Sequence, residues 1–280
     1  MKFQSIKLSL FAMLFAGLAM PFAFTSCGDD DEDGDDNTEQ DGGGGSNTDK
    51  NARALSVTID ESGLTYEDYT IEQSGEVLIE FKKVPFGKVK VTLEDLPTSV
   101  AELKKLKLPN GMKDIHETPY LTPALMVAAI NQLTKNRDEA KNMIDYISKE
   151  VKSENRDGKM VHYPGKGATQ IYVSEWNQLK QWVNFDKVRS FFEGTSYYNG
   201  YEKKPWVMTM ELTNYSYTAD PDYVQLWLTS TSLKDSKGNP TPREYGIWKY
   251  DSNGDGEYDY FFGSTMLQLC SGLATYSTDY

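Results

Sequence analysis

The stretch TPALMVAAINQL, residues 122–133, decides what kind of fold this chain can adopt. Thr122 is a suitable N-cap, Pro123 suits the first helical position, and apolar residues then follow on nearly every side of the helix. A helix that is apolar all round is stable in water only when other elements cover it. We therefore expect residues 122–133 to form the central, buried helix of a domain.

Further helices are expected on both sides of it. Residues 136–151 (NRDEAKNMIDYISKEV) combine an Asn136 cap, acidic residues in the first turn and one apolar stripe, so they complete an antiparallel helical hairpin. Residues 98–108 open with the capping-box pair Ser99 and Glu102. A third helix of the main group is expected over residues 174–185 (SEWNQLKQWVNF).

Strand patterns surround these helices. Four alternating segments between residues 206 and 262 are joined by polar turns and predict an antiparallel β-meander. Residues 51–95 predict four short strands with a turn at 83–88 (KVPFGK), forming either a small sandwich-like module or the first layer of the larger domain. The expected fold class is α+β for residues 96–280: a helical hairpin and a third helix packed on the meander, preceded by the small β segment.

The first 50 residues read differently from the rest. Lys2 and Lys7 precede an apolar stretch that is too short for a membrane span, which is typical of a signal peptide over residues 1–26. Cys27 follows, and residues 29–49 hold ten acidic residues and no basic one. With four glycines at 42–45, residues 27–50 are expected to be a disordered tether.

The segment FTSC, residues 24–27, resembles the lipobox of bacterial lipoproteins, although Phe24 stands where the commonest pattern has Leu. The resemblance implies that Cys27 is lipidated and anchors the chain to a membrane. The acidic stretch after it resembles the surface-export signal of Bacteroidota lipoproteins. That likeness implies display on the outer face of the outer membrane, with the periplasmic face as the alternative.

A second resemblance covers residues 115–270. The blocks TPYLTPALMVAAINQL, KVRSFFEGTSYYNGYEKKPWVMTMEL and PREYGIWKY are similar, in order and spacing, to a bacterial domain family of unknown function. The resemblance implies a shared fold and carries no chemistry with it.

Charge and cysteine content limit the function further. The net charge of −13 is concentrated in the tether, because residues 50–280 carry 27 basic and 32 acidic residues. No basic cluster is present, so nucleic acid is not an expected partner. Cys270 has no partner once Cys27 is lipidated, and we expect it to be a small buried apolar residue.

A calcium loop is one candidate site. In DSNGDGEYD, residues 251–259, oxygen ligands alternate around Gly256 in the spacing of a calcium-binding loop. The position of the usual last glutamate is Phe262, and both flanks read as strand, so a plain hairpin tip is the alternative. The candidate Ca²⁺ ligands are Asp251, Asn253, Asp255, Glu257 and Asp259.

Aromatic residues form the other candidate. Trp227 and Trp248 alternate with polar residues on their strands, a pattern expected either of a platform on which sugar rings stack or of a second core. The candidate ligand-binding residues are Trp227, Trp248, Tyr223, Gln225 and Tyr250.

No catalytic residue is assigned. His116 and His162 are the only histidines and have no metal-ligand spacing, and the sequence has no G-x-S-x-G motif. We therefore expect a lipid-anchored cell-surface protein that acts as a non-catalytic binding or accessory module for a glycan or a protein ligand, for example an envelope protein. The alternatives are a glycan-directed hydrolase, which requires two facing carboxylates, and a structural envelope protein.

Overall fold

The computed structural model describes residues 51–148, 151–156, 159–164, 185–234, 236–251, 256–263 and 269–270, with backbone alone for 151–164 and 185. The expected signal peptide and tether, with Cys27, lie outside this part of the chain. All described residues belong to one folded unit, Gly45–Tyr280.

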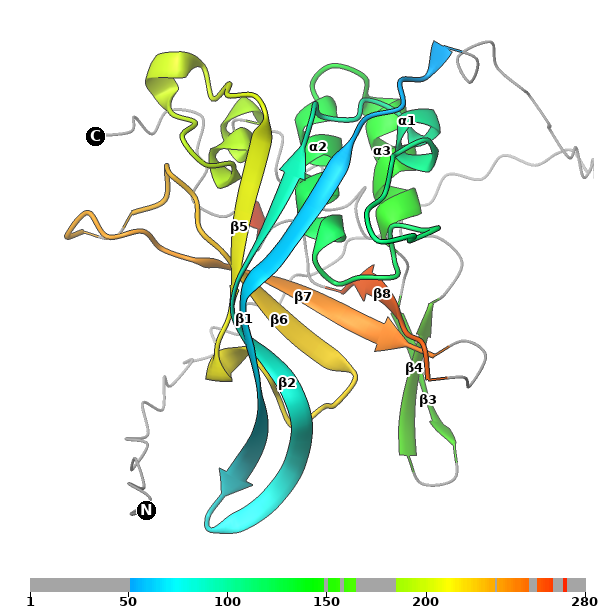
Figure 1. Cartoon of the computed structure of the whole chain (residues 1–280), viewed down its shortest axis with the longest axis vertical. Helices are drawn as coiled ribbons and strands as arrows, with labels where there is room; N and C mark the ends of the chain where they lie inside the picture. Colours follow the sequence, from blue (N-terminus) through cyan, green and yellow to red (C-terminus); the bar gives the residue numbers. More distant parts are fainter. Residues whose placement is uncertain are drawn as a thin grey trace, which may run out of the picture. The chain divides into compact units, whose positions relative to one another are not determined.

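A six-stranded antiparallel sheet organises this unit, in the order β1-β2-β5-β6-β7-β8 (Figure 1). The α+β class is thereby confirmed, because helices accompany the sheet. β6, β7 and β8 cross β1, β2 and β5 at a steep angle (Figure 1). Because the two groups of strands diverge, β5 and β6 share only two residue pairs. The strands are β1 (Val57–Gln73), β2 (Glu76–Leu93), β5 (Trp206–Leu212), β6 (Tyr223–Leu228), β7 (Arg243–Tyr250) and β8 (Asp259–Phe262).

The first two strands form one long hairpin in place of the four short strands expected. Its turn lies at Ser74 and Gly75, both with positive φ, so the prediction of a turn at 83–88 is wrong. Pro85 and Gly87 instead lie inside β2, where shifts of register absorb them. At Gly87, φ is +115° and a Cβ would approach the carbonyl oxygen of Gly63 to 2.2 Å. Glycine therefore suits this position, where the backbones of the paired strands β1 and β2 lie unusually close together.

This hairpin supplies the first two strands of the main sheet. Residues 87–93 of β2 pair with β5, whereas the rest of the hairpin extends past the end of β5 (Figure 1). Trp206, Met208, Met210 and Leu212 are buried and alternate with less buried residues on β5, as expected for a strand with one face in the core.

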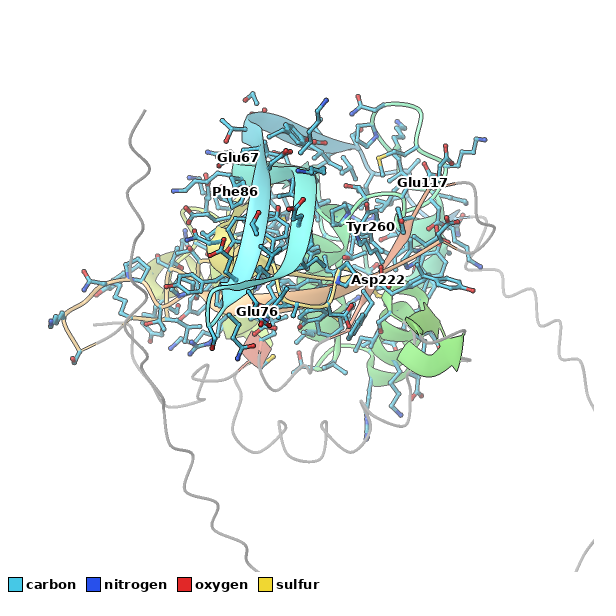
Figure 2. The ribbon with its side chains drawn as sticks, turned by 90° about the horizontal axis from the view of Figure 1, so that it is seen from below. Glu67, Glu76, Phe86, Glu117, Asp222 and Tyr260 are labelled. Carbon is cyan, nitrogen blue, oxygen red and sulfur yellow. The ribbon has the colours of Figure 1, made fainter. Side chains whose placement is uncertain are left out.

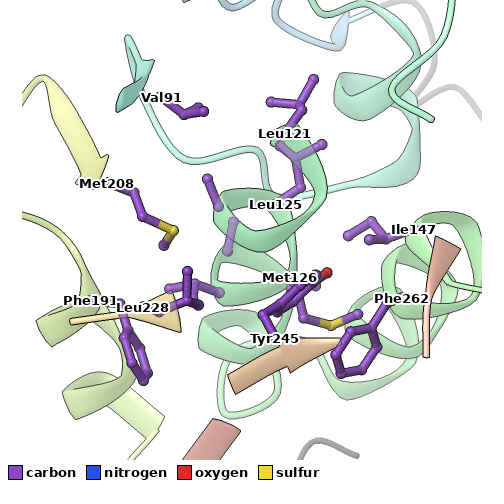
Figure 3. Packing of buried hydrophobic residues seen from close by; sticks show 14 of the residues in the cluster. Val91, Leu121, Leu125, Met126, Ile147, Phe191, Met208, Leu228, Tyr245 and Phe262 are labelled. Atoms are coloured by element: carbon purple, nitrogen blue, oxygen red, sulfur yellow. The ribbon is translucent and has the colours of Figure 1, made fainter. Parts of the chain in front are cut away.

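α2 (Leu121–Gln132) is the central helix that the sequence predicts, and each of its residues is buried. Leu121, Leu125 and Met126 pack among side chains of the sheet and of α3 (Figure 3). The prediction of Thr122 as the cap is wrong, because the helix begins two residues earlier, at Leu121, with Tyr120 in the cap position. Thr122 therefore lies inside the first turn, and its hydroxyl has no hydrogen-bond partner among the described residues.

α3 (Arg137–Ile147) begins as expected, since Asn136 Oδ1 accepts a hydrogen bond from the Glu139 amide at 3.2 Å. It ends earlier than expected. Ser148 turns to an extended conformation and bridges to Phe262 of β8, and Val151 opens a separate hairpin. That hairpin consists of β3 (Val151–Arg156) and β4 (Lys159–Pro164).

The remaining helical predictions are met in part. Ser99 caps α1 (Val100–Lys104) by accepting from the Glu102 amide at 3.2 Å, although α1 is shorter than expected. Residues 174–184 of the third expected helix lie outside the described residues. Cys270 is buried, as expected. Within the described ranges, no helix has the length and hydrophobicity to span a membrane.

Candidate ligand pocket

A pocket of about 350 Å³ opens where the β1–β2 hairpin passes the ends of β6, β7 and β8. Figure 2 shows the curved hairpin, with Glu76 at its tip, beside Tyr260 and Asp222. Five tyrosines line the pocket together with one acidic and one basic side chain. These seven residues are Glu61, Tyr66, Tyr120, Tyr217, Tyr223, Lys249 and Tyr260.

Tyr217 fastens the hairpin wall of the pocket to the rest of the sheet. It follows the short 3₁₀ helix Asn214–Ser216, and its hydroxyl donates a hydrogen bond to the carbonyl oxygen of Pro85 in β2. Its ring also packs against Phe81 and Phe86, with centroids 5.4 and 5.3 Å away. Burial of this kind raises the pKa of the Tyr217 hydroxyl well above its ordinary value.

The opposite wall comes from strand ends on the helix-facing side of the sheet. Lys249 of β7 and Tyr260 of β8 are paired residues on that face, and Tyr120 lies directly before α2. The amide of Tyr260 donates to the carbonyl oxygen of His116 at 2.8 Å, which fixes the position of its side chain relative to the loop before α2.

His116 lies beneath this wall and connects three segments of the chain. Its Nδ1 lies 2.5 Å from Asp114 Oδ1, its Nε2 lies 3.0 Å from the carbonyl oxygen of Ile147, and its ring packs on Phe261. The hydrogen bond from His116 holds the pKa of Asp114 below its ordinary value. Both ring nitrogens are therefore engaged in holding the loop, the end of α3 and β8 together.

Three polar groups in the pocket have unused hydrogen-bonding capacity. The hydroxyls of Tyr120 and Tyr260 and the ammonium of Lys249 have no hydrogen-bond partner in the described part of the chain. Burial raises the pKa of both tyrosines, so they remain neutral donors and acceptors across the physiological range. Groups of this kind bond to solvent or to a ligand that replaces it.

The pocket provides no facing pair of acids within the described residues. Glu61 is the single carboxylate among the lining side chains described, and it lies at the exposed rim, where it accepts a hydrogen bond from Tyr66 at 3.4 Å. Hydrolysis of a glycosidic bond ordinarily requires two carboxyl groups on either side of the scissile bond. The described lining of this pocket therefore contains one carboxylate where that reaction ordinarily uses two.

The aromatic residues predicted as a ligand platform do share one face of the sheet. Tyr223 pairs with Trp248, Gln225 with Gly246 and Trp227 with Glu244, and Tyr250 follows Trp248 on the same face. The rings of Tyr223 and Trp248 lie 4.8 Å apart. All five predicted residues are half-buried, and Gly263 packs directly on the Trp248 indole. Only Tyr223 among the five also lines the pocket.

The candidate calcium ligands are described only in part. Asn253 and Asp255 lie outside the described residues, while the amide of Gly256 donates to Asp251 Oδ2 at 3.0 Å, as in a turn. No group of three or more acidic, histidine or cysteine side chains is gathered within the ranges that the structure covers. Calcium binding at residues 251–259 stays a prediction.

Comparison with known proteins adds one finding. A family model described as a domain of unknown function (DUF6935) matches residues 95–272. The chain belongs to this family. Neither the curated proteins nor the solved structures searched contain a match to it.

The DUF6935 region contains only part of the pocket. It runs from α1 past β8 and supplies Tyr120, Tyr217, Tyr223, Lys249 and Tyr260. The wall formed by β1 and β2 lies before it in the chain. The pocket is thus built jointly by the DUF6935 region and by the hairpin that precedes it.

Most of the lining residues could not be found from sequence patterns. Tyr120, Tyr217, Lys249 and Tyr260 come from four distant segments, so no fixed spacing connects them. The only available signal was composition: 18 tyrosines in 280 residues is a large number, and tyrosine combines an apolar ring with a hydroxyl.

Proposed function

We propose that this chain is a lipid-anchored cell-surface protein that binds a carbohydrate in its tyrosine-lined pocket and does not transform it. The observation that carries the proposal is the set of unused hydrogen-bonding groups at Tyr120, Tyr260 and Lys249 within a pocket walled by aromatic rings. A ligand must offer both ring faces and polar edges to satisfy such a surface.

Sugars meet this requirement. A pyranose ring has an apolar face of C–H groups that packs against aromatic rings, and a rim of hydroxyls that donate and accept hydrogen bonds. The volume of about 350 Å³ lies at the small end of the range for ligand pockets, which fits one or two sugar units of a longer glycan. The exposed Tyr66 at the rim supplies a further ring for the units outside.

The proposed location rests on the sequence. The leader, Cys27 and the acidic tether support export, lipidation and display at the outer surface of a bacterial outer membrane. Mass spectrometry of the mature N-terminus is expected to find Cys27 acylated, and protease added to intact cells is expected to remove the protein. An unmodified Cys27 thiol, or full protection from protease, would refute this part of the proposal.

Binding is tested by titrating the full chain with a panel of mono- and disaccharides, followed by calorimetry or ligand-observed NMR. Tyr120→Phe and Tyr260→Phe each remove one unpartnered hydroxyl and keep the ring, so each is expected to weaken binding by about 3- to 10-fold. Tyr197→Phe, on an exposed ring that does not line the pocket, is the matched control. Equal effects of all three substitutions on the affinity would show that the sugar does not bind in the pocket, and would refute this proposal.

A further inference from the structure

Lys249 is the one basic side chain among the described residues that line the pocket. It is half-buried on β7, and its backbone is held by the hydrogen bond from its amide to the carbonyl oxygen of Asp222 at 2.9 Å. Its ammonium forms no ion pair with any described carboxylate, and its one aromatic contact is the ring of Tyr258, 5.1 Å from Nζ.

The surroundings of this ammonium leave its charge only partly compensated. Burial lowers the pKa of Lys249, and the attraction of Asp222 and Asp220 offsets part of that shift without a direct contact. The acid inside the same pocket, Glu61, points to the exposed rim and bonds to Tyr66. An anion that entered the pocket would give the ammonium the close partner that the described protein groups do not supply.

We propose that the pocket selects sugars that carry a carboxylate, such as uronic acids, and that Lys249 is the residue that determines this specificity. The inference rests on the proposed binding of carbohydrate. The sugar ring packs against the tyrosine wall and bonds to Tyr120 and Tyr260, while its carboxylate accepts a hydrogen bond from Lys249 Nζ. An uncharged sugar of the same shape leaves the ammonium without that partner.

Methyl β-glucuronide and methyl β-glucoside test the inference, because they differ only in the oxidation state of C6. The full chain is titrated with each, and the glucuronide is expected to bind about 10-fold more tightly, the factor that one hydrogen bond between charged groups supplies. Lys249→Met keeps the length of the side chain and is expected to abolish the preference. Lys249→Arg keeps the charge and should retain most of it, and Lys88→Met, on an exposed residue outside the pocket, should change nothing.

The outcomes separate the two proposals. Equal binding of both sugars to the wild type, or a preference that survives Lys249→Met, would overturn the role of Lys249 and leave carbohydrate binding intact. Absence of binding by either sugar, and by the wider panel, would overturn both. If Lys249→Met does not fold, the salt dependence of wild-type binding decides: the preference must decline as ionic strength rises, and an unchanged preference would refute the inference.

Discussion

The substitution Glu102→Gln tests whether one buried carboxylate holds the start of the folded unit to α1. Glu102 is 5% exposed and accepts two hydrogen bonds from the Arg53 guanidinium, at 2.6 and 2.9 Å. It also accepts from the amide and hydroxyl of Thr98 at 2.8 and 3.1 Å. Burial alone would raise the pKa of Glu102, but the bonds from Arg53 and Thr98 outweigh it and lower the pKa.

The expected loss lies between two limits. Breaking a fully buried ion pair costs about 3–5 kcal/mol, and breaking an exposed pair about 0.2–1 kcal/mol. The Arg53 side chain is 42% exposed and keeps its second partner, Asp95, at 2.9 Å, so it is easily rehydrated. We therefore expect Glu102→Gln to lower the free energy of unfolding by about 2 kcal/mol, which lowers the Tm by about 4–8 °C for a domain of this size.

The assay is thermal unfolding followed by circular dichroism at several pH values, with Glu76→Gln at the exposed hairpin tip as the control. Because the folded-state pKa of Glu102 is lowered, its contribution is fully present above its ordinary pKa of 4.5 and is lost as pH falls through the folded-state value. The difference in Tm between wild type and Glu102→Gln must therefore close in acid. A Tm unchanged at neutral pH, or a difference that persists in acid, would refute the reasoning.

Three further predictions concern the core, the loop before α2 and the calcium loop. Leu125→Ala removes a fully buried side chain of α2, so the free energy of unfolding should fall by about 2–5 kcal/mol in urea titrations, and a smaller loss would contradict the central place of this helix. Asp114→Asn removes the negative charge that strengthens the hydrogen bond with His116; because the pKa of Asp114 is lowered, the variant should be less stable than wild type at neutral pH, and the difference in Tm should close as pH falls through the lowered folded-state pKa, so a difference that persists in acid would contradict this role. Calorimetric titration with Ca²⁺ should give heat for the wild type and none for Asp255→Ala; two flat traces would exclude a calcium site at residues 251–259.

Periodicity and capping residues predicted the parts of the fold that depend on local sequence. The apolar run of α2, the Asn136 cap of α3 and the alternation along β5 were each legible, because each involves residues within one or two turns of one another. The end of α3 was not, since Ser148 leaves the helix to pair with Phe262, more than a hundred residues away. Long-range pairing overrides a helical pattern that would otherwise continue.

The turn of the hairpin and the pocket were both missed by sequence patterns, each for its own reason. The sequence pattern predicts a turn at Pro85 and Gly87, because proline and glycine ordinarily mark turns, whereas the structure has the turn at Ser74 and Gly75. Proline and glycine are tolerated inside β2 because the register of the strand shifts nearby. The shared face of Trp227 and Trp248 followed from alternation alone. The pocket required knowing that β6–β8 cross the hairpin, and no local pattern contains that angle.

The division of the pocket at the boundary of the DUF6935 region has a practical consequence. The DUF6935 region supplies Tyr120, Tyr217, Tyr223, Lys249 and Tyr260, whereas Glu61, Tyr66 and Pro85 lie on the β1–β2 hairpin. The hairpin contacts that region through Tyr217 and through the pairing of β2 with β5. Exchange of the β1–β2 hairpin between two members of this family would therefore change one wall of the pocket and leave the wall supplied by the DUF6935 region unchanged.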